Sequence, residues 1–383
     1  MNLPKDIFEA YKSDFQNGQF GVGNLCDADC FFCSQKWNPP DVTKDLRRLL
    51  TMDEIKDLAE KSGQNKITFI GSGIHTNNGE FLLHPQVPEI LEFFKTKNML
   101  TNWPFLFSNG MSLSEELIKF IKKLNIVIVL SLNSANVTNR KKMMGSNDSK
   151  NKNAIDCVEL FDKYGLNYCI DIVPLRSNLD NGDLENSIKF LKGTKVKVIG
   201  ILRPGYTKLT PEPIVKELSI TDKELFEFAS LMRERYKVNI SVVTFAQTEI
   251  QNYLLRLLEY IFNTNKDLIT KRKLFLCSES VKDVFPLVLE KLKIPNSEIK
   301  VVKSRVFGGN VSSAGLLLVE DYIYAIDEFL KEEEKRRPEC LILPDVSFDI
   351  NKEDIRMVSY KEIENRCGIE VCAITVPAEL KYI

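Results

Sequence analysis

The chain has 383 residues, of which 44% are hydrophobic and 27% are charged, as is usual for globular proteins. Its 52 Lys and Arg residues nearly balance its 53 Asp and Glu residues, which argues against recruitment of nucleic acid or of an anionic membrane. There is no apolar run long enough to span a bilayer and the N-terminus is charged, so we expect a cytoplasmic protein with no membrane association.

Strand and helix signals alternate along the first half of the chain. Helices are expected at 4–15, 87–97, 153–165 and 184–191, and capping-box patterns open three more at Thr51-x-x-Glu54, Ser112-x-x-Glu115 and Thr221-x-x-Glu224. The expected strands lie at 19–25, 66–71, 104–108, 126–132, 167–173 and 195–201, and a further strand follows at 238–244. This alternation predicts an α/β fold with a six-stranded parallel sheet covered by helices.

A second alternation follows a bridge that we place at about 246–267. Strands are expected at 273–277, 299–303 and 340–344, with helices at 280–292 and 321–334. The sequence therefore predicts two domains, a core over residues 1–245 and a smaller α/β domain over residues 246–383.

Three cysteines, Cys26, Cys30 and Cys33, follow the first expected strand at the spacing C-x3-C-x2-C. Iron–sulfur clusters are normally held by four cysteines, so a four-iron cluster held by three leaves one iron with an open position. An open position is typical of catalytic metals. The spacing differs from those of the bacterial and plant-type ferredoxins.

Two simpler interpretations of these cysteines, a zinc site and buried structural thiols, fit the sequence less well. A zinc knuckle needs a fourth ligand, and neither His75 nor His84, the only histidines, completes a regular pattern. Buried structural thiols are common, but clustering of three cysteines within eight residues argues against that interpretation. The odd total of nine cysteines indicates a reducing compartment.

The triplet, with the aromatic Phe32 before its last cysteine, resembles the signature of the radical S-adenosylmethionine (SAM) superfamily. The resemblance implies a partial (β/α)6 TIM-like barrel, a [4Fe–4S] cluster on Cys26, Cys30 and Cys33, and SAM at the fourth iron with Phe32 beside its adenine. It also implies an oxidoreductase- or transferase-type enzyme that cleaves SAM reductively to a 5′-deoxyadenosyl radical. The radical would abstract hydrogen from a small-molecule or peptide substrate, and a flavodoxin- or ferredoxin-type protein would supply the electron.

The ends of the expected strands supply candidate SAM contacts. Gly71, Ser72 and Gly73 follow the second strand, where the family usually has Gly-Gly-Glu, and we assign Gly71 and Gly73 to the SAM amino group. For Ser72 a tight strand-to-helix turn is an equal alternative. The stretch from Asn78 to Pro85 resembles the part of the family motif after the glycines, displaced by an insertion. For Glu80, as for His75, contact with substrate is one interpretation, and we expect surface placement instead.

Further candidates follow the later strands. Ser108, Ser131 and Asn133 resemble family positions, the last two being the usual ribose contact, although Ser and Asn are also common in loops. Arg203, and less strongly Arg176, are candidates for binding a carboxylate through the guanidinium fork. An exposed loop arginine is the alternative for both.

The second domain has a resemblance of its own. Residues 302–317 and 341–344 resemble an uncharacterised domain that follows the radical SAM core in a group of bacterial Fe–S oxidoreductases. We expect its Gly- and Ser-rich turn at 307–315 to shape the substrate pocket. Cys340, Cys367 and Cys372 raise the question of an auxiliary cluster, but their spacing is irregular and a fourth ligand is missing.

Two alternative functions stay open from the sequence. One is a radical SAM enzyme that modifies RNA or protein, although no basic stripe favours RNA. The other is a non-catalytic Fe–S electron-transfer protein, because the element at Gly71–Gly73 departs from the family pattern.

Overall fold

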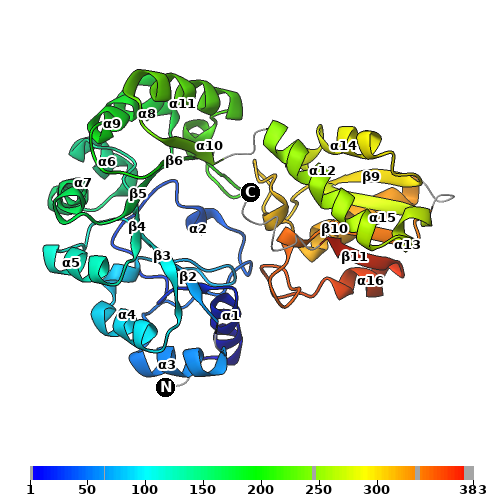
Figure 1. The fold of residues 1–383 in the computed structure, drawn as a ribbon, viewed down its shortest axis with the longest axis horizontal. Helices are drawn as coiled ribbons and strands as arrows, with labels where there is room; N and C mark the ends of the chain where they lie inside the picture. The colour runs from blue at the N-terminus through cyan, green and yellow to red at the C-terminus, as the bar shows by residue number, and fades with distance from the viewer. Residues whose placement is uncertain (1–2, 64, 244–246, 333–336, 375–383) are drawn as a thin grey trace. The chain divides into compact units, whose positions relative to one another are not determined.

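The computed structural model describes residues 3–63, 65–243, 247–332 and 337–374 (Figure 1). It divides into two compact units, residues 1–244 and 245–383. Among the described residues there is no helix long and apolar enough to cross a membrane.

The first unit is built on a seven-stranded parallel sheet whose strands lie side by side in sequence order. The sheet curves, with helices on its outer side (Figure 1), as a partial barrel does. Its strands are β1 (Gln19–Phe20), β2 (Ile67–Ile70), β3 (Leu100–Ser108), β4 (Val127–Ser131), β5 (Tyr168–Ile172), β6 (Ile199–Leu202) and β7 (Ile240–Val243).

The predicted α/β barrel fold is confirmed, but the sheet has seven strands instead of six. β7 extends it by pairing with β6, so the segment at 238–244 is an edge strand of the same sheet. Ile240 and Val242 are buried while Ser241 and Val243 are exposed, the alternation of a strand that packs on one face only.

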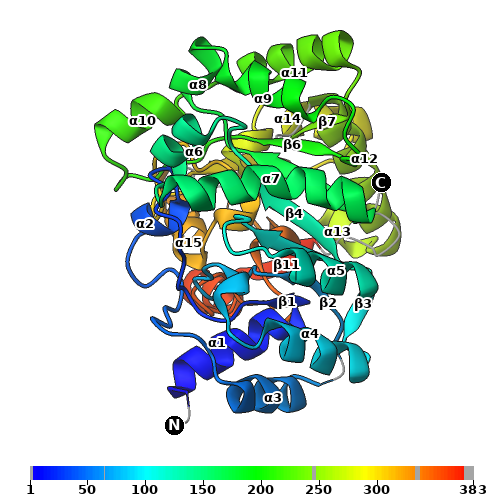
Figure 2. The same cartoon turned by 90° about the vertical axis from the view of Figure 1, so that its left-hand side faces the viewer.

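Helices connect successive strands and cover the outer face of the sheet. Figure 2 shows α5 and α7 lying in front of the strands. The helices of this unit are α1 (Lys5–Gln16), α2 (Ser34–Trp37), α3 (Met52–Lys61), α4 (Val87–Thr96), α5 (Glu115–Lys123), α6 (Val137–Met144), α7 (Asp148–Tyr164), α8 (Arg176–Asp180), α9 (Asp183–Leu191), α10 (Glu212–Leu218) and α11 (Asp222–Tyr236).

The core of the first unit lies between the sheet and these helices. In β5, for example, Tyr168, Ile170 and Ile172 are fully buried in it. Cys169 and Asp171 alternate with them and therefore belong to the inner face of the sheet.

The helix starts match the predicted capping residues in part. The capping boxes at Thr51 and Thr221 are both present. The third was wrong: Ser114 caps α5 by accepting from the Leu117 N–H, and Ser112 instead donates to Asp27. α6 was not predicted because it carries no continuous apolar stripe, and buried Arg140 lies in its middle.

The second unit contains a four-stranded parallel sheet in the order β11-β10-β8-β9, packed on both faces. Its strands are β8 (Lys273–Ser278), β9 (Ser297–Val302), β10 (Cys340–Pro344) and β11 (Glu370–Ile374). Its helices are α12 (Gln247–Thr264), α13 (Asp267–Thr270), α14 (Phe285–Leu292), α15 (Val319–Glu332) and α16 (Lys361–Cys367). Neither α13 and α16 nor β11 was predicted from the sequence.

The predicted bridge at 246–267 is mostly the helix α12, which belongs to the second unit. Leu255, Leu258 and Ile261 of α12 are buried with Phe275 of β8 and Val288 of α14. The segment is therefore part of a hydrophobic core and not a linker.

The three cysteines of the second unit considered for an auxiliary cluster, Cys340, Cys367 and Cys372, do not lie on one face of the sheet. Cys340 and Cys372 belong to the core on one face of the four-stranded sheet, and Cys367 to the core on the other face. An auxiliary cluster held by all three is therefore not supported.

The place of α12 in the second core generates a prediction. Leu258→Ala removes a fully buried side chain and should cost about 2–5 kcal/mol. Hydrogen exchange should show faster opening of β8 and β10 than in the control Tyr260→Ala, which changes an exposed ring on the same helix. Unchanged protection of both strands would contradict this packing.

Candidate active site at the carboxyl edge of the first sheet

The three cysteines lie on the loop between β1 and α2. Cys26 is exposed, Cys30 and Cys33 are partly buried, and all three are free thiols. The Cys33 N–H donates to the Cys30 carbonyl over 3.2 Å. The loop therefore begins where β1 ends, at the carboxyl edge of a parallel sheet, where α/β barrels collect their catalytic groups.

The loop is also attached to the end of α6. Its Asp29 N–H donates to the Met144 carbonyl at 2.7 Å, and its Phe31 N–H to the Met143 carbonyl at 3.3 Å. Phe32 packs edge-on against Phe31 in the same small apolar cluster. These contacts give the cysteine loop a defined backbone path.

The thiols influence one another electrostatically. The pKa of Cys30 is raised to about 12, mainly by burial and further by the neighbouring Cys33 and Cys26. Burial also raises the pKa of Cys26. In the metal-free chain these groups hold their protons, which metal binding would displace.

The donor set fits an iron–sulfur cluster better than a single ion. Within the described ranges, no three His, Cys, Asp or Glu side chains are arranged to hold one metal ion. In a four-iron cluster each thiolate ligates a different iron, and soft thiolates suit such clusters.

The stretch from Asn78 to Glu80 lies against the cysteine loop. The Gly79 N–H donates to the Gly23 carbonyl at 2.7 Å, and the Glu80 N–H to the Leu25 carbonyl at 2.8 Å. A Cβ on Gly79 would lie 2.0 Å from the Leu25 oxygen. Only glycine allows this close approach of the two backbones.

Glu80 is buried, so its predicted surface placement was wrong. Its carboxylate accepts from the Asn109 N–H at 2.7 Å and the Leu82 N–H at 3.2 Å. Burial raises the pKa of Glu80 to about 7, and these hydrogen bonds oppose the rise. His75 is also fully buried, contrary to expectation.

Asn109, which follows β3, connects Glu80 with the cysteine loop. Its side-chain amide donates to Asp27 at 2.8 Å and lies 3.7 Å from the Cys26 sulfur. Asp27 also accepts from Ser112 at 3.0 Å and from Lys150 at 3.1 Å. Burial would raise the pKa of Asp27, but the hydrogen bonds outweigh it and lower the pKa.

Arg140 joins the ends of two strands. Its guanidinium donates to the carbonyls of Asn109 at 2.6 Å, Leu132 at 3.0 Å and Ser131 at 3.1 Å. Burial lowers the pKa of Arg140 to about 10, so it stays charged near neutral pH. Arg140 stands in no motif and was not predicted. Asn109 stands in the stretch Ser108-Asn109-Gly110, which resembles a family position, but only Ser108 was chosen there as a site residue.

The predicted turn from Gly71 to Gly73 is hydrogen-bonded to β1, and the residues directly after it to the helix α1. Gly71 has φ of +80° and Ser72 donates to Gln19 at 3.1 Å. Just beyond, the Asp14 carboxylate of α1 accepts from the backbone N–H groups of residues 74, 75 and 76 at 2.8, 2.8 and 3.1 Å. The turn is thus held by β1 and the segment after it by α1, whereas Gly79 and Glu80 contact the cysteine loop.

The predicted polar contacts at the next strand ends are placed at the same edge. Ser108 is buried and its hydroxyl accepts from the Gly110 N–H at 2.9 Å. Ser131 ends β4, half-buried. Asn133 has φ of +58°, and its side-chain oxygen accepts from the Val173 N–H at 2.8 Å.

Both candidate arginines pair with carboxylates of α11. Arg203 lies 3.1 Å from Asp222, and Arg176 lies 2.8 Å from Glu224. These ion pairs join the loops after β5 and β6 to α11. The assignment of Arg203 to a cofactor carboxylate stays a prediction.

A protein family and a curated protein match this chain. Residues 21–191 match the model of the radical SAM superfamily. A curated S-adenosylmethionine-dependent nucleotide dehydratase from Flammeovirga pacifica is 26% identical over 240 residues, which cover 61% of this chain and 76% of that protein.

Parts of several solved structures also align with this chain. SuiB of Streptococcus suis, bound to the precursor peptide SuiA, aligns with a TM-score of 0.43 and 16% identity over 60% of this chain and 48% of its own. Native anSMEcpe with bound AdoMet aligns with a TM-score of 0.42 and 17% identity over 63% of this chain and 65% of its own. This chain therefore spans less than two thirds of either solved chain.

The close approach of Gly79 generates a prediction. Gly79→Ala forces its Cβ against the Leu25 carbonyl, so we expect destabilisation of about 1–3 kcal/mol and poorer iron loading. Gly205→Ala is the matched control, because a Cβ there meets nothing within 4 Å. Thermal unfolding and iron content after reconstitution measure both. Equal values for the two variants would contradict the packing.

Proposed function

Residues 21–191 form a domain of the radical SAM superfamily, and we propose that this chain is an enzyme that binds a [4Fe–4S] cluster through Cys26, Cys30 and Cys33 and cleaves SAM reductively. When bound, the cluster and SAM together supply a 5′-deoxyadenosyl radical, which takes a hydrogen atom from the substrate. The chain's own residues hold both cofactors, orient the substrate and exclude water.

One observation carries the proposal. Three free thiols lie on a single loop directly after β1, at the carboxyl edge of a parallel sheet, and two of them raise the pKa of the third, Cys30. Backbone hydrogen bonds from two other segments, the end of α6 and the stretch at Gly79 and Glu80, define the path of this loop. A donor set held in this way favours a fixed cluster with one open iron.

For the amino group of SAM we now favour Gly79 and Glu80 over Gly71, Ser72 and Gly73. The first pair contacts the cysteine loop through backbone hydrogen bonds, while Gly71 and Ser72 bond to β1 and the residues after Gly73 bond to α1. The Glu80 carboxylate keeps lone pairs beyond those used by its two backbone donors.

The remaining contacts of SAM keep their predicted partners in this proposal. Phe32 would lie beside the adenine, and Ser131 and Asn133 would bind the ribose. Ser108 would support them from β3. Phe32 lies on the cysteine loop and the others at the carboxyl ends of β3 and β4, the edge at which that loop begins.

The substrate that we propose is a small molecule or a peptide. On the inner face of the sheet the rings of Phe69 and Phe105 stack at 6.0 Å, with Phe107 beside them. Asp171 belongs to the same face, and burial raises its pKa to about 6. Stacked rings and a carboxyl group suit a substrate with a planar part and a hydrogen-bond donor.

The curated relative gives the first compounds to test. Since that protein is described as a nucleotide dehydratase, a nucleotide that loses water is the small-molecule reaction to examine first. The proposal also includes a flavodoxin- or ferredoxin-type electron donor and an anoxic, cytoplasmic setting.

The test of the proposal is production of 5′-deoxyadenosine. After anaerobic reconstitution, dithionite and SAM should give the nucleoside with wild type, and Cys30→Ala should lower its yield about a hundredfold or more by losing a cluster ligand. Cys372→Ala, a change to a cysteine of the second unit, should keep the wild-type yield.

Two results would contradict the proposal. A chain that reconstitutes a four-iron cluster but yields no 5′-deoxyadenosine would favour an electron-transfer protein. Wild-type yield from Cys30→Ala would show that this thiol is not a ligand.

The assignment of Glu80 gives a separate prediction. Glu80→Gln replaces an oxygen that accepts backbone hydrogen bonds and removes the charge, so the Kd for SAM should rise about tenfold or more while iron content stays within experimental error. Glu116→Gln, on the exposed side of α5, is the control. Equilibrium dialysis of reconstituted protein measures the Kd, and equal values for the two variants would exclude the role.

A further inference from the structure

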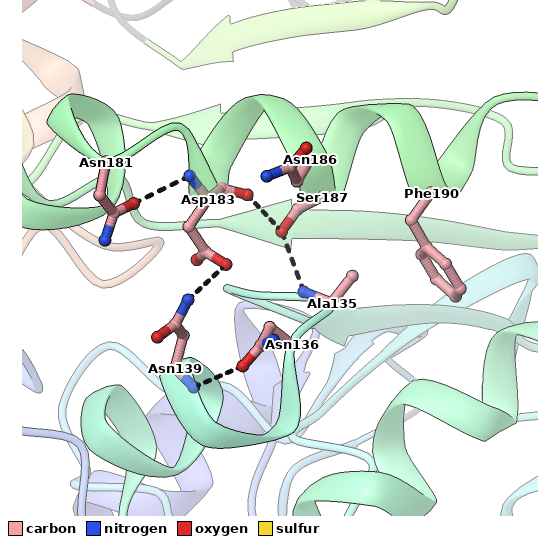
Figure 3. A pocket seen from close by; sticks show the side chains of 8 residues that line it. All are labelled: Ala135, Asn136, Asn139, Asn181, Asp183, Asn186, Ser187 and Phe190. Atoms are coloured by element: carbon pink, nitrogen blue, oxygen red, sulfur yellow. Dashed lines mark hydrogen bonds between the residues drawn. The ribbon is translucent and has the colours of Figure 1, made fainter.

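A cavity of about 510 Å³ lies between the loop after β4, the start of α6 and the helix α9 (Figure 3). This volume is in the usual range of small-molecule sites. None of the residues that line it belongs to the cysteine loop or to the predicted SAM contacts. The cavity thus lies outside the site described above.

Asp183, at the start of α9, is the charged group of this cavity. Its side chain is directed from α9 toward α6 (Figure 3). Oδ1 accepts from the Ser134 hydroxyl at 3.0 Å and from the Asn139 amide at 2.8 Å. Oδ2 is buried and has no hydrogen-bond partner among the described residues.

An unpaired buried carboxylate oxygen is costly, because it has lost water without gaining a donor. Asp183 as a whole is only 5% exposed. Among the described residues that line the cavity there is no lysine or arginine. The negative charge therefore lacks both a hydrogen-bond donor for Oδ2 and a cation in the cavity wall.

The rest of the lining also suits a cation. Phe190 lies two helical turns beyond Asp183 on the same face of α9, and its ring is 41% exposed. The face of an aromatic ring attracts organic cations. Asn136, Asn181 and Asn186 line the cavity as well; the side-chain oxygens of Asn136 and Asn181 already accept from the N–H groups of Asn139 and Asp183.

We propose that this cavity binds an organic cation, a guanidinium or ammonium group, with Asp183 as its counter-charge and Phe190 as its aromatic wall. The volume leaves room for more than the charged group itself, which favours an organic ligand over a bare metal ion. The cation can come from a free small molecule or from a peptide side chain.

The cavity shares a loop with the predicted SAM site. The Ala135 N–H donates to the Ser187 hydroxyl at 2.9 Å, and Ser134 donates to Asp183. Both residues directly follow Asn133, the predicted ribose contact. A ligand in the cavity would therefore contact Asp183 and Ser187, the residues of α9 that hold this loop. Binding of that ligand does not depend on the proposed reaction with SAM.

The experiment compares two probes on the full chain by titration calorimetry. Nα-Acetyl-L-argininamide carries the guanidinium as its only charge, and Nα-acetyl-L-citrullinamide replaces it with a neutral urea of similar shape. We expect argininamide to bind about tenfold tighter or more. A blocked peptide, Ac-Gly-Gly-Arg-Gly-Gly-NH2, distinguishes the sources: tighter binding than argininamide indicates a peptide, and weaker binding a free small molecule.

Two variants locate the binding. Asp183→Asn keeps an oxygen for Ser134 and Asn139 but removes the charge, so argininamide affinity should fall about tenfold. Phe190→Leu changes an exposed side chain and should lower it about threefold. Its exposed position keeps the test valid if Asp183→Asn folds poorly.

Three results would overturn the proposal. One is no binding of argininamide at about 10 mM, and another is equal binding of both probes. The third is argininamide affinity that neither variant changes. Iron content and 5′-deoxyadenosine yield, measured in parallel, show whether a failure concerns this cavity or the proposed enzyme.

Discussion

The backbone contact between the cysteine loop and the segment after β2 is the constraint on which the candidate site depends. Gly79 and Glu80 donate to the carbonyls of Gly23 and Leu25, and the two backbones approach so closely that no side chain fits at Gly79. Since Leu25 directly precedes Cys26, this contact determines where the first thiol lies. β1 has only two residues, so without this contact the path of the loop would depend mainly on its hydrogen bonds to the end of α6.

From this contact, hydrogen bonds continue across the edge of the sheet. Glu80 accepts from Asn109, Asn109 donates to Asp27, and Arg140 connects Asn109 with Ser131. The carboxyl ends of β1 to β4 are thereby held together by buried polar groups. Such a network orders a site only if its buried polar groups have hydrogen-bond partners. Arg140 is an example, because its guanidinium nitrogens donate to neighbouring oxygen acceptors.

The charge of Arg140 has a further consequence. It favours the thiolate form of Cys30 and thus partly opposes the effect of burial. A buried cation near three thiolates would also stabilise the negative charge that a thiolate-bound cluster brings. The same side chain therefore holds the strand ends and adjusts the electrostatics of the loop.

Local patterns predicted much of the fold. The alternation of apolar runs with capped helices gave the parallel sheet and most of its strands, since period and capping are encoded in neighbouring residues. The strand at 238–244 was recognised, but its place in the same sheet was not. α12 was taken for a bridge because its apolar face becomes a core only against strands further along the chain.

For the candidate site, the sequence identified Cys26, Cys30 and Cys33 from their spacing alone. It could not show that Glu80 is buried, because its partner Asn109 comes 29 residues later. It also could not show that Asp14 fixes the segment after Gly73, a contact over 60 residues. Both depend on which strand ends become neighbours, and local spacing does not contain that information.

The proposed function requires that SAM binds directly to a cluster on the cysteine loop. Electron paramagnetic resonance of the reduced, reconstituted chain, recorded with and without SAM, tests it most directly. We expect a four-iron signal whose g values shift when SAM is added, because SAM changes the ligands of one iron. A four-iron signal that is identical with and without SAM would contradict it.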